Sequence, residues 1–187
     1  TFNYDSVTET LTISGEGDIT GYYWTGTNAS PFQYCTVKHI VIEEGITALG
    51  NYIFHYVYDI ESFSIPASVT TIQVYAMSYA TFVGGAGNGF TVAEGNESFC
   101  ADNGTLYDKN KTKLIKFVNS GLTEFTVPVT VSSIEQEAFY NDVTLEKLVL
   151  NGSNLVLQSY AIRDAKIKHL EINEGVKSLG DYCSIDS

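Results

Sequence analysis

Apolar residues recur along this chain at a fixed offset. The pattern around Ile40 returns around Phe63 after 23 residues, and it appears again around Phe125, Leu148 and Leu170 at spacings of 23 and 22 residues. Self-similarity with a period of about 20 to 50 residues is typical of solenoid proteins. The sequence therefore predicts coils of about two dozen residues that stack and share one apolar interior.

Each repeat has seven apolar positions, numbered here from its central strand residue as −3, 0, +2, +6, +9, +13 and +14. Across the five regular repeats 33 of these 35 positions are apolar, and Asn154 and Ser184 are the exceptions. Positions 0 and +2 lie on the same side of a strand, so positions −1 and +1 must point outward. Positions +6 and +9 predict a short return segment, and positions +13 and +14 close the turn.

Two regions depart from the repeat. Residues 1–36 lack the period and begin with two strand-like runs, at residues 2–4 and 10–13, which predict a hairpin that caps the first coil. In residues 84–118 a glycine-rich loop precedes two strand-like runs around a polar turn, which predicts an inserted hairpin. We expect one structural domain, with the cap over residues 1–36 and the solenoid over residues 37–187.

The charge balance narrows the choice of partner. The chain has 10 Lys and Arg against 22 Asp and Glu, a net charge of −12. This argues against a nucleic acid and against an anionic lipid surface, because both require a basic patch. No apolar run approaches the roughly 20 residues of a membrane span, so we expect no direct membrane insertion.

Catalytic and metal-binding motifs are missing. The three cysteines are far apart and include no Cys-x-x-Cys, and the sequence has no Gly-x-Ser-x-Gly, no His-Glu-x-x-His and no phosphate loop. Asp108 and Asn110 resemble the start of a calcium loop, but the Gly and Glu that should follow are absent. We expect no catalytic residue, no metal and no cofactor, and therefore a protein that is not an enzyme.

Two surfaces are candidates for binding. The first is the outward sheet face at positions −1 and +1, which reads either as a partner site or as solvated sheet; it comprises His39, Val41, Ser62, Ser64, Thr91, Glu124, Thr126, Lys147, Val149, His169 and Glu171. The second is a row at position +12, which reads either as a packing ladder or as an exposed aromatic strip; it comprises Tyr52, Tyr75, Tyr160 and Tyr182. A further aromatic cluster at residues 22–24 reads either as the core of the cap or as another candidate binding surface.

The repeat resembles that of the BspA-like leucine-rich-repeat proteins. Residues 63–72 and 125–134 both read apolar-x-Ile/Val-Pro-x-x-Val-x-x-Ile, and Ala76-Met77 and Ala138-Phe139 follow them. The inserted run from Gly104 to Phe117 is similar to a hairpin that this family carries, and residues 10–15 are similar to a common N-terminal lead-in.

The resemblance implies a mainly β, right-handed leucine-rich-repeat solenoid with short strands and turns, an N-terminal hairpin cap and an inserted hairpin. It also implies an extracellular or cell-surface, adhesion-type module that binds a host or matrix protein, or a glycan. The alternative is a structural spacer or stalk of a larger surface protein. The ligand, the mode of anchoring and the oligomeric state stay open at this point.

Overall fold

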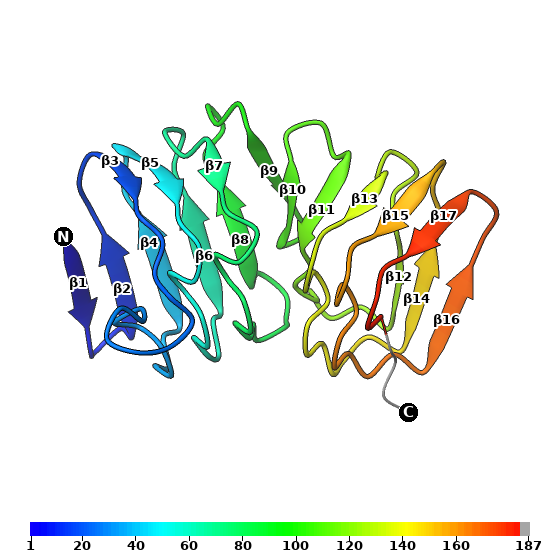
Figure 1. Cartoon of the computed structure of the whole chain (residues 1–187), viewed down its shortest axis with the longest axis horizontal. Helices are drawn as coiled ribbons and strands as arrows, with labels where there is room; N and C mark the ends of the chain where they lie inside the picture. The colour runs from blue at the N-terminus through cyan, green and yellow to red at the C-terminus, as the bar shows by residue number, and fades with distance from the viewer. Residues whose placement is uncertain (184–187) are drawn as a thin grey trace. The chain divides into compact units, whose positions relative to one another are not determined.

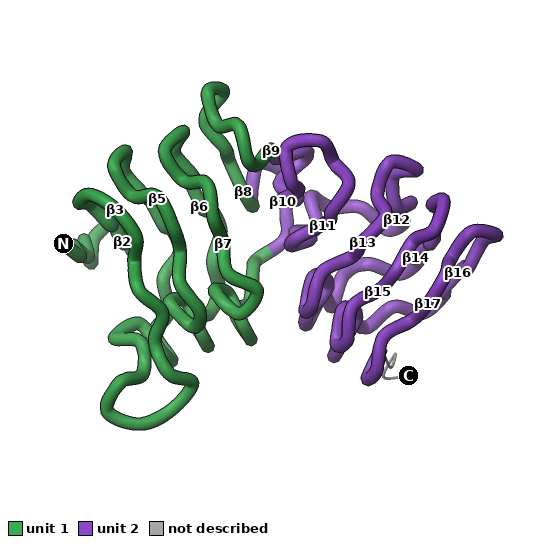
Figure 2. The backbone as a smooth tube through the Cα atoms, turned by 45° about the horizontal axis from the view of Figure 1, so that its top comes forward, with its two compact units in different colours: residues 1–83, 89–100 green, residues 84–88, 101–187 purple. Residues whose placement is uncertain are grey.

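The computed structural model describes residues 1–183, and these fold into short strands and turns without a helix (Figure 1). The residues form two compact units (Figure 2). Unit 1 contains residues 1–83 and 89–100, and unit 2 contains residues 84–88 and those from 101 onward. Ser184, one of the two exceptions to the apolar pattern, lies outside the described residues.

Unit 1 has a main sheet built from the strands of position 0. Its order is β1-β2-β4-β6-β8, and all neighbours are parallel except the antiparallel pair β1–β2. The bounds are Phe2–Asp5 for β1, Thr10–Ile13 for β2, His39–Ile42 for β4, Ser62–Ile65 for β6 and Gly89–Val92 for β8. A parallel return sheet, β3-β5-β7, comprises Gly17–Ile19, Ile46–Leu49 and Thr71–Ile72.

The core of unit 1 lies between these two sheets. In the main sheet Leu11 is paired with Ile40, Ile40 with Phe63, and Phe63 with Phe90, so the position-0 side chains form a column. All four are buried, and so is Leu49 on the return sheet. Burial of such side chains stabilises the fold by about 1.5–3 kcal/mol each.

Unit 2 repeats the arrangement. Its main sheet, β12-β14-β16, comprises Glu124–Thr126, Lys147–Leu150 and His169–Ile172 in parallel. The return sheet has the order β17-β15-β13-β11-β10-β9, with Val176–Leu179, Leu155–Leu157, Ser133–Ile134, Lys113–Lys116, Thr105–Asp108 and Phe99–Asp102, and only the last two residues of β9 belong to unit 2. Phe125, Leu148 and Leu170 pair in register and form the position-0 column, so the predicted stacking of coils is confirmed within each unit.

A hairpin is present at both places where the sequence predicts one, as β1–β2 and as β10–β11. Strand β2 does more than cap, because it also pairs in parallel with β4 and so forms the first rung of the main sheet. The long connection between β3 and β4 hides this rung from a search at a fixed period. The boundary at residue 36 stays a prediction.

Candidate functional site

The outward sheet face of unit 1 consists mostly of small residues, and its polar side chains contact one another. Positions −1 and +1 pair in register across the strands, so His39 lies beside Ser62, and Val41 beside Ser64. The Nδ1 atom of His39 lies 2.9 Å from the Ser62 Oγ atom, within hydrogen-bond distance. This face presents Thr91 as its most exposed member and no large aromatic side chain.

The same face of unit 2 carries charges that are paired with each other. The Lys147 ammonium lies 3.1 Å from a Glu124 carboxylate oxygen and 3.2 Å from one of Glu171. The hydrogen bond to Glu124, and then that to Glu171, raises the pKa of Lys147. Val149 was expected to be exposed on this face but is only 5% exposed. It lies between its register partners, Thr126 on one side and Glu171 on the other. His169 is exposed.

The tyrosines of position +12, here called the first tyrosine row, stack in pairs within each unit. In unit 1 the rings of Tyr52 and Tyr75 have centroids 5.4 Å apart and an interplanar angle of 14°. In unit 2 the rings of Tyr160 and Tyr182 are 4.8 Å apart at 2°, and Tyr182 is 68% exposed. The prediction that stacked coils place these rings side by side is therefore confirmed for each pair.

A second tyrosine row, which the sequence analysis missed, lies in unit 1. It consists of Tyr34, Tyr56 and Tyr79, with centroids 5.2 Å apart in the first pair and 4.9 Å apart in the second. Tyr34 is 64% exposed. Buried His55 lies between the two rows, with its ring centroid 5.2 Å from that of Tyr52 and 4.3 Å from that of Tyr56. The rows therefore form one aromatic surface at the corner of the coils.

The backbone at the second row is strained. Tyr34, Tyr56 and Tyr79 have φ angles of 65°, 54° and 55°, in the left-handed region that disfavours residues with a Cβ. At position +16 of unit 2 the same backbone conformation is taken by Asn141 and Asp164, which tolerate it better. Strain of this kind is a reason to look for function, because the fold does not require tyrosine there.

The stacking determines what the rows can offer to a ligand. Near-parallel rings cover each other's faces, so the middle ring, Tyr56, presents mainly its edge and hydroxyl group. A sugar stacks on the face of an aromatic ring, whereas protein interfaces use tyrosine both as an apolar body and as a hydrogen-bonding group.

The aromatic residues at positions 22–24 do not form the core of the cap. Tyr23 is 65% and Trp24 62% exposed, and the Trp24 backbone oxygen accepts a hydrogen bond from the Gln33 side chain. They belong to the long connection before β4, where Phe32 takes the buried place and packs against Phe54 at 6.3 Å. The interpretation as cap core was wrong, because the connection carries no periodicity that separates buried from exposed positions. The alternative, a binding surface, stays a prediction.

The corner of unit 2 is charged where that of unit 1 is aromatic. Glu137 stands at position +12 instead of a tyrosine, and its backbone oxygen accepts a 2.9 Å hydrogen bond from the Lys116 ammonium. Lys116 is only 4% exposed, and this burial lowers its pKa to about 8, against an opposing influence of Glu137. The Arg163 guanidinium lies 5.3 Å from the centre of the Tyr160 ring.

The carboxylates of Glu44 and Asp108 accept hydrogen bonds from backbone amides and so stabilise turns. The Glu44 carboxylate accepts hydrogen bonds from the backbone of Ala67, at 2.8 Å, and of Ser68, at 3.1 Å, and the former chiefly lowers the pKa of Glu44. Asp108 accepts from the Thr112 and Lys113 amides at 2.6 and 2.7 Å and so closes the β10–β11 turn. Among residues 1–183 no three His, Cys, Asp or Glu side chains are placed to hold a metal ion, and no disulfide joins the three cysteines.

Comparison with solved structures places this fold among bacterial proteins. The crystal structure of the pneumococcal vaccine antigen PcpA matches 91% of the chain with a TM-score of 0.62 and 17% identity. A leucine-rich cell surface protein from Faecalibacterium prausnitzii matches 75% of the chain with a TM-score of 0.55 and 21% identity. These matches cover 55% and 42% of the two solved chains, so this chain spans about half the length of its structural relatives.

The remaining comparisons concern membrane spans and family. No helix of a length and apolarity suited to crossing a membrane occurs in the part of the chain that the structure describes. No curated protein matches the chain. The family model of the BspA-type leucine-rich-repeat region matches residues 24–83 and 113–185, in six copies. The chain belongs to the BspA-type leucine-rich-repeat family.

Proposed function

We propose that this chain is a non-catalytic, adhesion-type module that binds a protein outside the cell or at its surface. The aromatic surface of unit 1, formed by Tyr34, Tyr56 and Tyr79 with Tyr52 and Tyr75, carries the proposal. Five tyrosines gathered on one corner supply large contact area with few rotatable bonds, and tyrosine is enriched among the residues that dominate binding energy at protein interfaces.

The tyrosines at position +16 of unit 1 support a binding function over a packing function. Unit 2 takes the same left-handed backbone there at lower cost with Asn141 and Asp164, although both units keep left-handed tyrosines at position +12. The sheet face is a weaker candidate, because the charges of Glu124, Lys147 and Glu171 are already paired with one another. Surface ion pairs of this kind contribute little to binding unless they are fully desolvated.

The net charge of −12 points to the kind of partner. An acidic module associates faster with a basic partner surface, and this attraction weakens with added salt. We therefore propose a host or matrix protein with exposed basic residues as the ligand. Salt sensitivity of the association rate separates this proposal from a purely apolar contact.

The test compares two tyrosine variants against a panel of purified extracellular-matrix proteins by surface plasmon resonance. In the first variant Tyr34, Tyr56 and Tyr79 become Ser; in the matched control Tyr160 and Tyr182 of unit 2 become Ser. We expect the first to weaken binding to a panel member by about tenfold or more, and the control by much less. If the wild-type chain binds no panel member, or if both variants bind as it does, a spacer role is favoured instead.

A further inference from the structure

Strand β12 leaves one edge of a sheet unpaired. It lies at the end of the order β12-β14-β16, so among the described residues it has a strand neighbour only on the side of β14. The Val127 N–H donates to the Val149 oxygen at 2.9 Å, and the Thr123 oxygen accepts from the Glu146 and Lys147 amides. Because backbone groups alternate along a strand, those of Glu124 and Thr126 point away from β14, toward the open edge.

Phe125 is less buried than the position-0 residues that have strands on both sides, and Leu170 of β16, at the other end of the same sheet, is likewise half-buried. Ile40, Phe63 and Leu148 at position 0 are fully buried, each between neighbouring strands. Phe125 is only half-buried, because no strand neighbour lies on its open side. The position-0 column of unit 2 therefore ends at Phe125 on this side.

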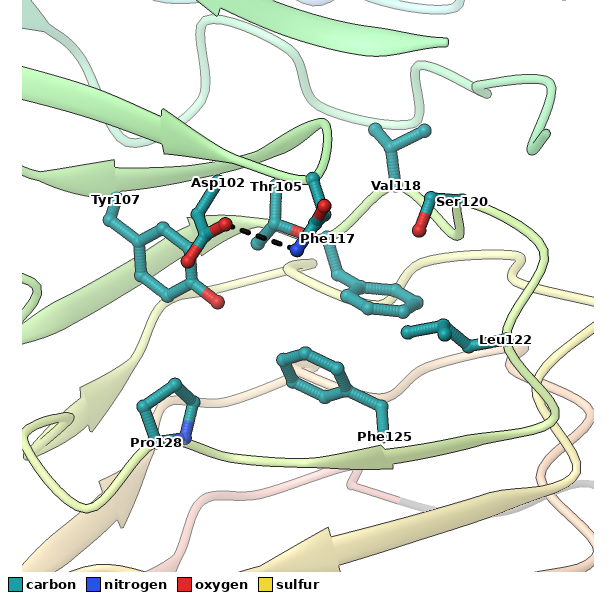
Figure 3. A pocket seen from close by; sticks show the side chains of 10 residues that line it. Asp102, Thr105, Tyr107, Phe117, Val118, Ser120, Leu122, Phe125 and Pro128 are labelled. Atoms are coloured by element: carbon teal, nitrogen blue, oxygen red, sulfur yellow. Dashed lines mark hydrogen bonds between the residues drawn. The ribbon is translucent and has the colours of Figure 1, made fainter. Parts of the chain in front are cut away.

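A pocket of about 90 Å³ lies beside Phe125, within unit 2 (Figure 3). Its apolar wall comprises Phe117, Leu122, Phe125 and Pro128, and the rings of Phe117 and Phe125 are 4.7 Å apart. Leu122 is 41% exposed, yet it is held in place because the Asn119 side chain accepts a hydrogen bond from its amide at 2.7 Å. A buried apolar cavity of about 150 Å³ holds benzene, so this smaller pocket suits an aliphatic side chain.

We propose that the β12 edge and this pocket bind an extended peptide segment of a partner protein, which adds to the sheet as a strand. The peptide backbone pairs with the N–H and C=O groups of Glu124 and Thr126, the mode known as β-augmentation. A side chain opposite Phe125 on the added strand points to the same side of the sheet as Phe125. A Leu, Ile or Val there enters the pocket and extends the position-0 column of unit 2 by one side chain.

The charges around the edge indicate which residues should flank the aliphatic side chain of that peptide. Lys147 is shared between two carboxylates, Glu124 and Glu171, so the sheet face beside the edge keeps an excess negative charge. Asp102 lines the pocket and is half-exposed, although it is paired with Lys111 at 2.6 Å. We therefore assign the site to an extended peptide with an aliphatic anchor between basic residues. This edge is separate from the tyrosine rows, so the two sites can fail independently.

The probe is the capped hexapeptide Lys-Thr-Leu-Thr-Val-Lys, titrated against the whole chain and followed by NMR. Strand β12 offers few backbone bonds, so we expect a Kd of about 0.1–1 mM, with shifts centred on Glu124, Phe125 and Thr126. Two N-methylated peptides each block one set of alternate amides. We expect one of them to bind about tenfold more weakly and the other to bind as the parent does, because only one side of an added strand pairs.

Protein variants complete the test. Thr126→Pro removes an amide that points to the open edge and keeps the Val127 bond to β14, so the strand should persist while peptide binding is lost. Leu122→Ser removes only part of the pocket wall, and it should weaken binding even if Thr126→Pro does not fold. Val129→Ser changes an exposed residue of the same unit and should bind as the wild-type chain does.

Three results would overturn the proposal. Equal affinity of both N-methylated peptides would show that no strand is added. Slow hydrogen exchange of the Glu124 and Thr126 amides in the free chain would show that the edge is already paired. Self-association of the wild-type chain that Thr126→Pro abolishes would assign the edge to a second copy of this chain.

Discussion

The two units use the same backbone plan and differ at their corners. At position +16 unit 1 has Tyr56 and Tyr79, and unit 2 has Asn141 and Asp164, all four with left-handed φ. At position +12 tyrosines stack in both units, but unit 2 also places Glu137 there, above the buried ammonium of Lys116. The core positions, by contrast, are interchangeable apolar residues in both units.

This difference indicates which parts of the repeat are constrained. A position that faces the shared interior is apolar, because a polar side chain there costs its own desolvation and disturbs both neighbouring coils. Asn154, the polar residue at position +6 of unit 2, is exposed and so does not face this interior. A corner position must only accept the backbone conformation of the turn. The chain can therefore vary the corners from coil to coil, and partner recognition can change there without loss of the fold.

The largest expected effect comes from removing one aromatic ring from the core column. We expect Phe63→Ala to destabilise unit 1 by about 3–5 kcal/mol, because its ring is fully buried between strand neighbours on both sides. Phe125→Ala in unit 2 should cost at least about 1 kcal/mol less, since Phe125 is half-buried at an open edge. Hydrogen exchange measured on peptides from each unit reports the two losses separately. Equal losses would contradict the open edge at β12.

The buried charge of unit 2 should make stability depend on pH. The pKa of Lys116 is lowered to about 8 from an ordinary value of 10.5, so its charged form is disfavoured in the folded chain. This penalty is complete below pH 8 and is relieved as the pH rises from 8 to 10.5. Across that window the wild-type chain should gain about 3 kcal/mol relative to Lys116→Met.

Urea unfolding of both proteins at pH 7, 9 and 10.5 measures this difference. Lys116→Met combined with Glu137→Gln is the control, because it also removes the carboxylate whose charge acts on Lys116. The double variant should follow the pH profile of Lys116→Met. A constant difference between wild type and Lys116→Met from pH 7 to 10.5 would refute the buried ammonium.

A smaller effect follows from exchanging residues between the two corners. Asn141→Tyr places a tyrosine at a left-handed position of unit 2 and should destabilise that unit by about 1 kcal/mol. Tyr79→Asn in unit 1 relieves strain of the same size but loses stacking on Tyr56 worth about 0.5–1.5 kcal/mol, so its stability should stay within about 1 kcal/mol of wild type. Thermal unfolding of both variants checks this asymmetry. A loss above about 2 kcal/mol in Tyr79→Asn would make the second row a structural ladder.

Periodicity in the sequence was enough to predict the coils, their core and the first tyrosine row, because each depends on residues at a constant offset. The second row was missed because only Tyr56 and Tyr79 share the offset of +16, while Tyr34 follows a longer connection. Trp24 was misplaced for the same reason, since its connection has no period.

The pocket at β12 could not be predicted from local pattern. It depends on the inserted strands β10 and β11, which extend the return sheet of unit 2 and have no counterpart in its main sheet. Phe125 fits the repeat as well as Phe63 does, and its partial exposure arises only from the strand pairing. Such a site depends on which strands are neighbours, and a single sequence does not specify that at the edge of an irregular repeat.

The smallest expected effect concerns the charged sheet face of unit 2. Replacing Lys147 by Met removes the ammonium between Glu124 and Glu171, but both ion pairs are partly exposed, so Tm should fall by no more than about 2 °C at low salt. The pKa of Lys147 is raised, so its contribution is present below the ordinary pKa of lysine and is lost as the pH rises through the raised value. Molar salt should abolish the difference, because exposed pairs are screened. In unit 1 the matching change, Ser62→Ala, removes a hydrogen bond to His39 and no ion pair, so it should show no salt dependence. If the two variants respond alike to salt, the electrostatic difference between the two sheet faces does not exist in solution.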